Sequence, residues 1–288
     1  SDIDILDGAG FLTLRLKGWW DRRFDMPESF YRIRSSIPGN MLSKPLEGLF
    51  ESSGVEVHAV LVDDVTQEFL ESSDRIWERV LAHLVLGRGE RGEFSKMGGI
   101  AKRRHEWLIG RAAVKDSVRA LHKASNGADL FPADIVVAKD QKARPFIAEF
   151  SGSGAPVVSL SHSAGVAVAA CARGVFGIGV DIEAIRELEE GFEAAAFSQK
   201  DIALLGSKDP ERSERIIRAW CAKEAVAKAL GTGLGGRQKE LEISSVDWKT
   251  GTFEIIVPPS IGRGPENEKI KAYTMRRGDY VLAGSIIR

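Results

Sequence analysis

The hydrophobic pattern of this chain passes twice through a similar order of strands and helices, which limits the possible folds more than any other feature. Beyond residues 1–53, Val55–Val62 alternates and is rich in β-branched side chains, as in a half-buried strand. Helical periodicity follows over Val65–Leu86 and Gly99–Lys123, and it returns over Glu211–Leu230. The pattern predicts an α+β fold of two similar halves, each a small, largely antiparallel sheet packed on a long helix, with a cleft between them.

Shorter strand-like segments surround the predicted helices. They are expected at 135–138, 145–147, 157–160, 165–172, 177–183, 243–248, 252–257, 270–275 and 280–287. The recurrence divides the chain into residues 1–53, a linker or the remnant of a preceding domain, residues 54–155, the N-terminal half, and residues 156–288, the C-terminal half. No residue-level repeat relates the two halves.

The composition excludes several classes of partner. Lys and Arg total 40 against 41 for Asp and Glu, so the overall charge favours neither nucleic acid nor an acidic membrane. Cys171 and Cys221 form no CxxC pair, which is typical of a reduced chain without disulfides. The sequence holds neither a membrane-length apolar run nor a signal-peptide pattern, so we expect a cytoplasmic location.

Two carboxylates lie on one face of the predicted strand 177–183. Side chains alternate along a strand, so Asp181 and Glu183 share a face, with open space beside them at Gly179. The aliphatic side chains on the opposite face are Ile178, Val180 and Ile182. Neighbouring carboxylates repel unless a cation lies between them, and Mg²⁺ binds through one or two carboxylates plus substrate phosphates. The alternative is the solvent-facing edge of an ordinary amphipathic strand.

Charged residues also fall on the inward side of the long helix Glu211–Leu230. Lys223 lies within its apolar arc, Glu224 lies beside that arc, and Lys228 lies near its border. Inward charges are costly unless they are paired or contact a ligand, so Lys223 and Glu224 are predicted to serve a ligand. A surface ion pair of Glu224 with Lys228, worth about 0.2–0.5 kcal/mol, is the alternative for Lys228.

Two further groups suit an anion. Ser161 and His162 end a strand without the GxSxG elbow of a serine hydrolase, and both can donate hydrogen bonds to a phosphate. Arg104 and Arg111 are seven residues apart on one helical face, where two guanidinium groups could bind a dianionic phosphate. A structural histidine and a solvated charge run are the respective alternatives. The glycine-rich segment 231–236 follows a helix and lacks the GK(S/T) ending of a P-loop.

In their order along the chain, Ser-His-Ser (161–163), Gly-Ile-Gly-Val-Asp-Ile-Glu (177–183) and Trp-Cys-Ala-Lys-Glu-Ala-Val-Ala-Lys (220–228) resemble the phosphopantetheinyl transferase superfamily. The second and third segments match its (V/I)G(V/I)DxE and (W/F)xxKExxxK motifs. The resemblance covers about Val55 to Arg288 and is greatest to the surfactin type, in which one chain holds two related halves.

This resemblance implies roles for individual residues. Asp181, Glu183 and Glu224 correspond to Mg²⁺ ligands, and Lys228 corresponds to a lysine at the phosphate beside the scissile bond. His162 matches a histidine near the 3′-phosphate of coenzyme A. The other residues expected to bind coenzyme A are Arg104, Arg111, Arg144, Ser161 and Lys223. Arg144 belongs to Ala143-Arg144-Pro145, which resembles a family Gly-Lys-Pro motif, whereas Arg104 rests on the helical-face argument.

The implied reaction transfers 4′-phosphopantetheine from coenzyme A to a serine of an acyl or peptidyl carrier protein and releases 3′,5′-ADP, for polyketide or fatty acid biosynthesis. Glu224 would accept the serine proton, and Lys228 would assist the leaving group. Two fused halves suggest a monomer. The alternatives are a Mg²⁺-dependent nucleotide phosphohydrolase and a non-catalytic module that docks carrier domains.

The N-terminal segment suggests a larger context. Leu16–Asp25 is similar to sequence that follows dehydratase-like domains in iterative polyketide synthases. The chain begins at Ser1 and its first methionine is Met26. We therefore expect the C-terminal transferase domain of such a synthase, acting on the synthase's own carrier domain.

Overall fold

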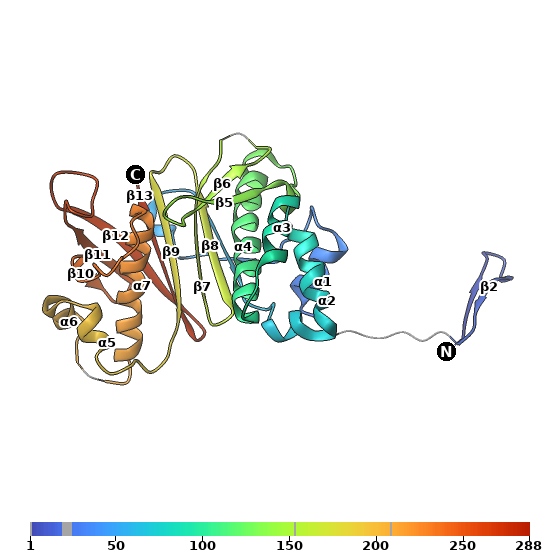
Figure 1. Ribbon diagram of the computed structural model, residues 1–288, viewed down its shortest axis with the longest axis horizontal. Coiled ribbons are helices and arrows are strands. Elements are labelled where there is room, and N and C mark those ends of the chain that lie inside the picture. Colours follow the sequence, from blue (N-terminus) through green and yellow to red (C-terminus); the bar gives the residue numbers. More distant parts are fainter. Residues whose placement is uncertain (1, 19–24, 153, 208) are drawn as a thin grey trace.

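The computed structural model describes residues 2–18, 25–152, 154–207 and 209–288. Two units, each a sheet with a long helix against it, lie side by side, and a small hairpin precedes them (Figure 1). The predicted α+β class, with antiparallel sheets packed on long helices, is confirmed. The aromatic and basic stretch 19–24 lies outside the described residues.

The first unit is built on a four-stranded antiparallel sheet with the order β3-β4-β8-β7. Its strands are β3 (Lys44–Pro45), β4 (Val57–Val62), β7 (Val157–Ser163) and β8 (Val166–Ala172). Its helical segments are α1 (Glu28–Ser35), η1 (Glu51–Ser53), α2 (Gln67–Val85), α3 (Arg88–Lys96), α4 (Ala101–Asn126) and η2 (Pro132–Asp134). A two-stranded ribbon, β5 (Val136–Lys139) and β6 (Pro145–Glu149), completes the unit.

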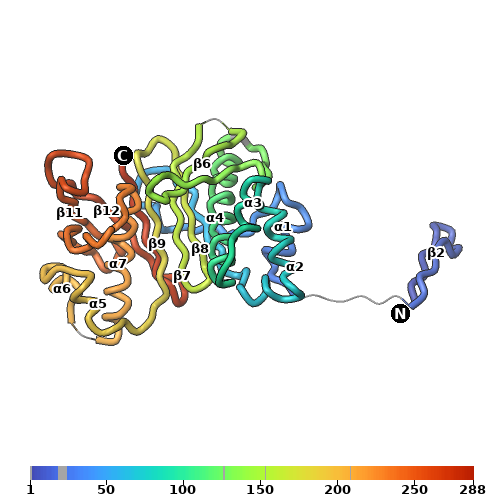
Figure 2. Tube along the Cα trace, in the orientation of Figure 1, coloured from blue at the N-terminus to red at the C-terminus, as the bar shows by residue number. Residues whose placement is uncertain are grey.

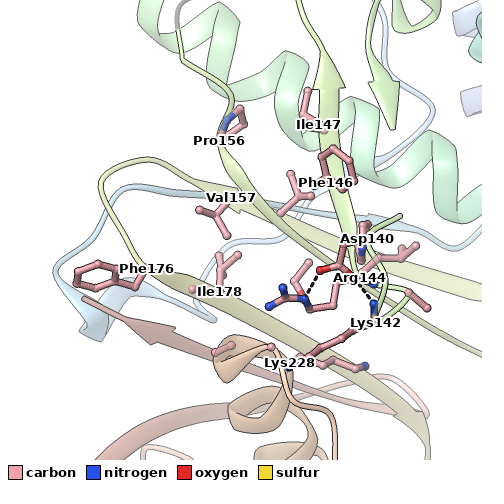
Figure 3. Close-up of a pocket in the computed structure, with 18 of the residues that line it drawn as sticks. Asp140, Lys142, Arg144, Phe146, Ile147, Pro156, Val157, Phe176, Ile178 and Lys228 are labelled. Atoms are coloured by element: carbon pink, nitrogen blue, oxygen red, sulfur yellow. Dashed lines mark hydrogen bonds and ion pairs between the residues drawn. The ribbon is translucent and has the colours of Figure 1, made fainter. Parts of the chain in front are cut away.

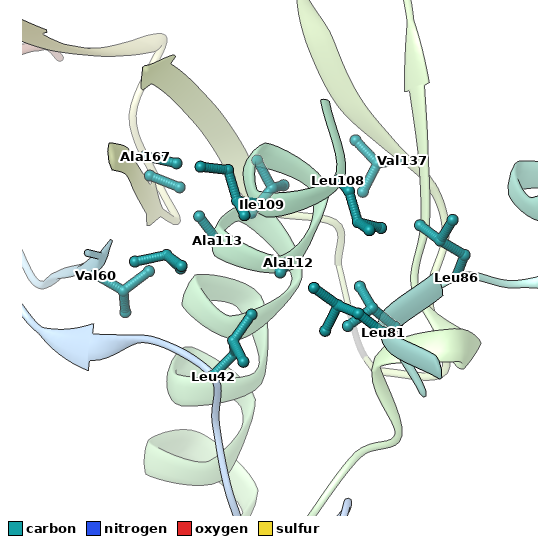
Figure 4. Packing of buried hydrophobic residues seen from close by; sticks show 14 of the residues in the cluster. Leu42, Val60, Leu81, Leu86, Leu108, Ile109, Ala112, Ala113, Val137 and Ala167 are labelled. Carbon is teal, nitrogen blue, oxygen red and sulfur yellow. The ribbon is translucent and has the colours of Figure 1, made fainter. Parts of the chain in front are cut away.

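Helix α4 is the centre of the first core, where its apolar side chains lie between the sheet and α2 (Figure 4). Leu108, Ile109 and Ala113 of this helix are completely buried. Gly110 brings α4 close to β7, because a Cβ atom at that position would lie 3.1 Å from the Leu160 Cδ2 atom. This close approach places the residues around Gly110 beside the end of β7.

The second unit repeats the arrangement with a five-stranded antiparallel sheet in the order β10-β11-β12-β13-β9. Its strands are β9 (Gly177–Ala184), β10 (Glu242–Asp247), β11 (Thr252–Val257), β12 (Glu268–Arg277) and β13 (Tyr280–Ile287). Its helices are α5 (Phe192–Ala196), α6 (Gln199–Leu204) and the long α7 (Arg212–Leu230), which packs across β9 and β13.

The two sheets share a third core that includes Val168, Ala170, Ile178 and Val180. The aliphatic face of β9 therefore points toward the first unit, as alternation predicted, and its other face points toward α7. The open space expected beside Gly179 is absent. A Cβ atom at Gly179 would lie 1.8 Å from the backbone oxygen of Ala225, because the backbone of α7 packs directly on β9.

Both predicted domain boundaries need correction. Strands β7 and β8 hydrogen-bond within the first sheet, so a boundary at 155/156 would cut that sheet, and the units divide between β8 and β9. The segment 1–53, predicted to be a linker or the remnant of a preceding domain, contributes to the first core. Its completely buried residues there are Phe30, Ile33 and Leu42. Tertiary contacts outweigh local composition in both cases.

The remaining N-terminal element is the hairpin of β1 (Ile3–Leu6) and β2 (Leu12–Leu16), which lies apart from the two units (Figure 2). All its residues are exposed except the half-buried Leu16. Within the described ranges, no helix has both the length and the apolar character that a bilayer crossing requires.

Candidate active site

The contact between α7 and β9 joins Asp181 to Lys228. One carboxylate oxygen of Asp181, Oδ1, accepts hydrogen bonds from Lys228 Nζ at 2.7 Å and from Ser161 Oγ at 2.8 Å. Lys228 Nζ also donates to Ser161 Oγ at 2.9 Å. The second carboxylate oxygen of Asp181, Oδ2, is buried without a hydrogen-bond partner among the described residues. A buried acceptor of this kind calls for an added donor or cation.

Glu183 and Glu224 stand near Asp181, from the same strand and from α7. Glu183 accepts a hydrogen bond from Ser163 Oγ at 3.0 Å. Burial raises the pKa of Glu183, and the charge of Asp181 raises it further. Burial also raises the pKa of Glu224, where Asp181 and Glu183 add to the increase and Lys228 opposes it. The structure therefore brings the three carboxylates close enough for their negative charges to repel one another. A bound cation would offset this repulsion.

These carboxylates suit a magnesium ion that is coordinated partly by the protein and partly by a bound ligand. Among the residues that the structure describes, no three His, Cys, Asp or Glu side chains form a group that could hold a metal ion. Mg²⁺ requires no such group, since it binds through one or two carboxylates together with waters and phosphates. The unpartnered Oδ2 of Asp181 and the half-buried carboxylate of Glu183 supply oxygen donors of that kind.

A basic cleft opens beside the carboxylates, between the two units. A cavity of about 340 Å³ is lined by Arg111, Lys139, Ala143, Pro145, Leu160, Ser161, His162 and Lys228. All four of its titratable lining residues are basic. They come from α4, β5 and β7 of the first unit and from α7 of the second, so both units build the wall. Such a cavity suits a polyanion.

A second cavity, of about 570 Å³, adjoins the first and shares Lys228 with it (Figure 3). It adds Lys142 and Arg144, with Asp140 as its one acidic lining residue. Its far part is apolar, formed by Phe146, Ile147, Pro156, Val157, Phe176 and Ile178. The combined cleft thus has a basic end beside the carboxylates and an apolar extension.

Arg111 is a buried cation that is suited to bind an anion. It is 3% exposed, and its guanidinium carbon lies 4.8 Å from the centroid of the Trp107 ring. Its Nε atom is 3.7 Å from Glu90 Oε1 and has no hydrogen-bond partner among the described residues. Burial lowers the pKa of Arg111, so a bound anion would lessen the cost of this charge.

Arg144 lies at the wall of the larger cavity. Its Nε atom donates to Asp140 Oδ2 at 2.6 Å (Figure 3). The preceding residue, Ala143, has φ of 62°, in the left-handed region that glycine adopts without strain. Alanine at this position is therefore strained. Gly231, at the end of α7, leaves the space that the Arg144 guanidinium fills.

The imidazole of His162 faces the smaller cavity and is 41% exposed. Burial lowers the pKa of His162, and the nearby carboxylate of Glu106 opposes this effect. The two cavities are thus lined by Ser161, His162, Arg111, Arg144 and Lys228.

Lys223 does not reach the cleft, and its assignment to coenzyme A needs correction. It is completely buried, and its Nζ atom donates to Asp201 Oδ2 at 2.7 Å and to the Gln238 carbonyl at 3.0 Å. The ring of Phe197 lies 4.9 Å from the same atom. Its inward position was predicted, but its partner is a carboxylate of α6, which no local pattern indicates.

Arg104 is likewise engaged inside the first unit. Its Nε atom donates to Glu78 Oε1 at 3.0 Å, and its Nη1 atom donates to the carbonyl oxygens of Phe94 and Met97. Arg104 therefore joins α2, α3 and α4, and it does not join Arg111 at a shared anion site.

Sequence analysis missed Lys139 and Lys142. Both lie in the β5–β6 ribbon and line the cleft. Their signal was the basic turn Lys139–Arg144, which holds three cationic side chains within six residues between two short strands.

The sequence of the second unit is similar to that of known proteins. The family described as the 4′-phosphopantetheinyl transferase superfamily matches residues 177–283. A holo-acyl-carrier-protein synthase of Geobacillus kaustophilus is 32% identical over 120 residues, covering 39% of this chain and 88% of that protein. The synthase of Ligilactobacillus salivarius is 29% identical over 122 residues, which cover 39% of this chain and 87% of that protein. That of Clostridium kluyveri is 38% identical over 76 residues, with 24% and 56% coverage.

Two solved holo-acyl-carrier-protein synthases resemble part of the structure. The protein of Thermotoga maritima has a TM-score of 0.33 and 22% identity, and the match covers 40% of this chain and 64% of that chain, just under two thirds. The protein of Neisseria meningitidis has a TM-score of 0.33 and 21% identity, with 40% and 98% coverage.

The fold and the site define a two-unit α+β protein with clustered carboxylates beside a basic cleft. The chain belongs to the 4′-phosphopantetheinyl transferase superfamily. The matched synthases correspond to less than half of the chain, and the family match lies within the second unit.

Proposed function

We propose that this chain transfers 4′-phosphopantetheine from coenzyme A to a serine of a carrier protein. The observation that carries the proposal is the juxtaposition of a cavity whose titratable lining is entirely basic with the group formed by Asp181, Glu183 and Glu224. Coenzyme A carries a pyrophosphate and a 3′-phosphate, and these anions match the cavity. Similarity to proteins named holo-acyl-carrier-protein synthases supports this choice of substrate.

The basic residues would hold the nucleotide part of coenzyme A. Arg111 and His162 would contact the 3′-phosphate, and Lys228 would contact the pyrophosphate next to the carboxylates. The Ser161 hydroxyl orients both Lys228 and Asp181, since it contacts each of them. Asp181 and Glu183, with Glu224 nearby, would hold Mg²⁺ together with the pyrophosphate oxygens, and the ion would supply positive charge that neutralises the pyrophosphate and the leaving group.

Glu224 would remove the proton from the acceptor serine. The reaction forms a bond between the serine oxygen and the β-phosphorus, breaks the pyrophosphate P–O bond and releases 3′,5′-ADP. Burial and the neighbouring carboxylates raise the pKa of Glu224, which makes this carboxylate a stronger base than an exposed one. Lys228 would stabilise the charge that develops on the departing phosphate.

Both walls of the cleft come from one chain, so a monomer would have a complete site, as in the surfactin type. We extend the proposal to a cytoplasmic enzyme that serves polyketide or fatty acid biosynthesis, with its carrier in the same synthase.

Intact-mass measurement of an apo carrier protein tests the proposal. The chain, coenzyme A and Mg²⁺ should add the mass of phosphopantetheine to the carrier, and omission of Mg²⁺ or the Asp181→Asn change should abolish the gain. Asp129→Asn is the matched control, because Asp129 pairs with Lys123 outside the cleft lining. Release of 3′,5′-ADP without carrier would indicate a phosphohydrolase, and carrier binding without any turnover would indicate a docking module.

A further inference from the structure

Glu106 lies on α4, close to the Nδ1 atom of His162, and it does not line the cleft. Its Oε2 atom is 3.8 Å from His162 Nδ1, and its Oε1 atom is 3.8 Å from Lys102 Nζ. Its side chain is 17% exposed, against 41% for that of His162. The carboxylate thus lies between the imidazole of His162 and the ammonium group of Lys102, and it is not part of the cavity lining.

We propose that Glu106 is a positioning residue that holds His162 with its Nδ1 edge toward α4 and its Nε2 edge toward the 3′-phosphate of coenzyme A. The inference rests on the proposed function for the identity of the ligand. A carboxylate behind a histidine fixes the ring orientation and the protonated nitrogen, as it does for histidines that bind metals. Since His162 is partly exposed, its ring would otherwise be free to turn.

The charges around His162 give Glu106 a second effect. His162 shares its cavity with Arg111, Lys139 and Lys228, and Lys102 approaches from α4. Burial lowers the pKa of His162 and so favours the neutral ring, Glu106 is the carboxylate that opposes this effect, and Lys228 and Lys102 add to the lowering. A charged ring binds phosphate more strongly than a neutral one. Glu106 therefore supports both the orientation and the charge of His162.

Calorimetric binding of 3′,5′-ADP and of 5′-AMP to the whole chain tests this role, because the two ligands differ by the 3′-phosphate. Glu106→Gln should weaken the binding of 3′,5′-ADP by roughly three- to tenfold, the size expected for a charge-assisted contact, and should leave 5′-AMP unchanged. In the transfer reaction the same change should raise KM for coenzyme A and leave kcat nearly unchanged.

Three controls separate positioning from folding. Glu106→Asp should restore part of the binding, and Glu68→Gln, at an exposed position of α2, should have no effect. In a His162→Ala background, Glu106→Gln should cause no further loss, since coupled residues are not additive.

Equal weakening of both ligands, or an undiminished loss in the His162→Ala background, would overturn the inference. So would a wild-type chain that binds the two ligands equally well, even if it modifies a carrier. If 3′,5′-ADP selectivity depends on Glu106 and no carrier is modified, the inference stands and the transfer proposal fails.

Discussion

At the scale of single residues, the ion pair of Lys228 with Asp181 lies within the second unit and contacts the first unit through Ser161. Their ion pair, at 2.7 Å, also includes Ser161 of the first sheet, so the site depends on how β7, β9 and α7 meet. The Asp181 side chain is only 5% exposed, and its Oδ2 atom accepts no hydrogen bond from the residues that the structure describes.

Lys223 allows a stability prediction at the same scale. Lys223→Met removes one member of a completely buried ion pair and leaves Asp201 uncompensated, so the free energy of unfolding should fall by about 3–5 kcal/mol. Urea denaturation measures the change. The matched control is Lys200→Met, which breaks an exposed pair with Glu242 and should cost less than about 1 kcal/mol. A Lys223→Met protein that kept its stability but lost coenzyme A binding would restore Lys223 to the site.

At the scale of secondary structure, the contact between β9 and α7 orients the carboxylates. Gly177 and Gly179 let the backbone of α7 lie directly on β9, since Cβ atoms at these positions would fall 1.9 Å and 1.8 Å from backbone oxygens of the helix. This approach brings Glu224 of α7 close enough for the charge of Asp181 on β9 to raise its pKa.

Gly179→Ala should separate β9 from α7. The added methyl group meets backbone rather than a flexible side chain, so we expect a loss of about 1–3 kcal/mol or more, together with a large fall in transfer activity. Denaturant unfolding and the carrier mass assay measure the two effects. Gly92→Ala in α3 is the control, because an added Cβ there has nothing within 4 Å and alanine favours a helix. Unchanged activity in Gly179→Ala would contradict this account of the site.

At the scale of the whole molecule, the N-terminal residues divide into a separate hairpin and a packed segment. Among the described residues, the hydrogen bonds of β1 and β2 lie within the hairpin segment, and a two-stranded hairpin is only marginally stable by itself. The segment after it is integral. The backbone N–H groups of Leu42 and Ser43 both donate to the buried carboxylate of Asp116.

Two truncations test this division. Removal of residues 1–25 should shift Tm by less than about 3 °C and preserve carrier modification. Removal of residues 1–43 should prevent stable folding, because it takes Phe30, Ile33 and Leu42 from the core and leaves Asp116 without three hydrogen-bond donors. Thermal unfolding and the mass assay measure both proteins. A stable, active chain without residues 1–43 would show that this segment is dispensable.

What the sequence determined by itself was local. The period-2 pattern of 177–183 correctly separated the aliphatic face of β9 from the face of Asp181, and helical periodicity correctly placed Lys223 inward. These features follow from backbone geometry and from the cost of burying charge. Both can be inferred from the pattern of residues close together in the sequence.

Only the tertiary structure decided which distant groups meet. It paired Lys223 with Asp201 and Arg104 with Glu78, and it joined β7 and β8 to the first sheet. It also set α7 against Gly179, where the isolated strand pattern suggested open space. Such contacts depend on how elements far apart in the chain pack and hydrogen-bond. A buried charge can pair with any opposite charge, and a strand edge with any other strand, that the fold brings near.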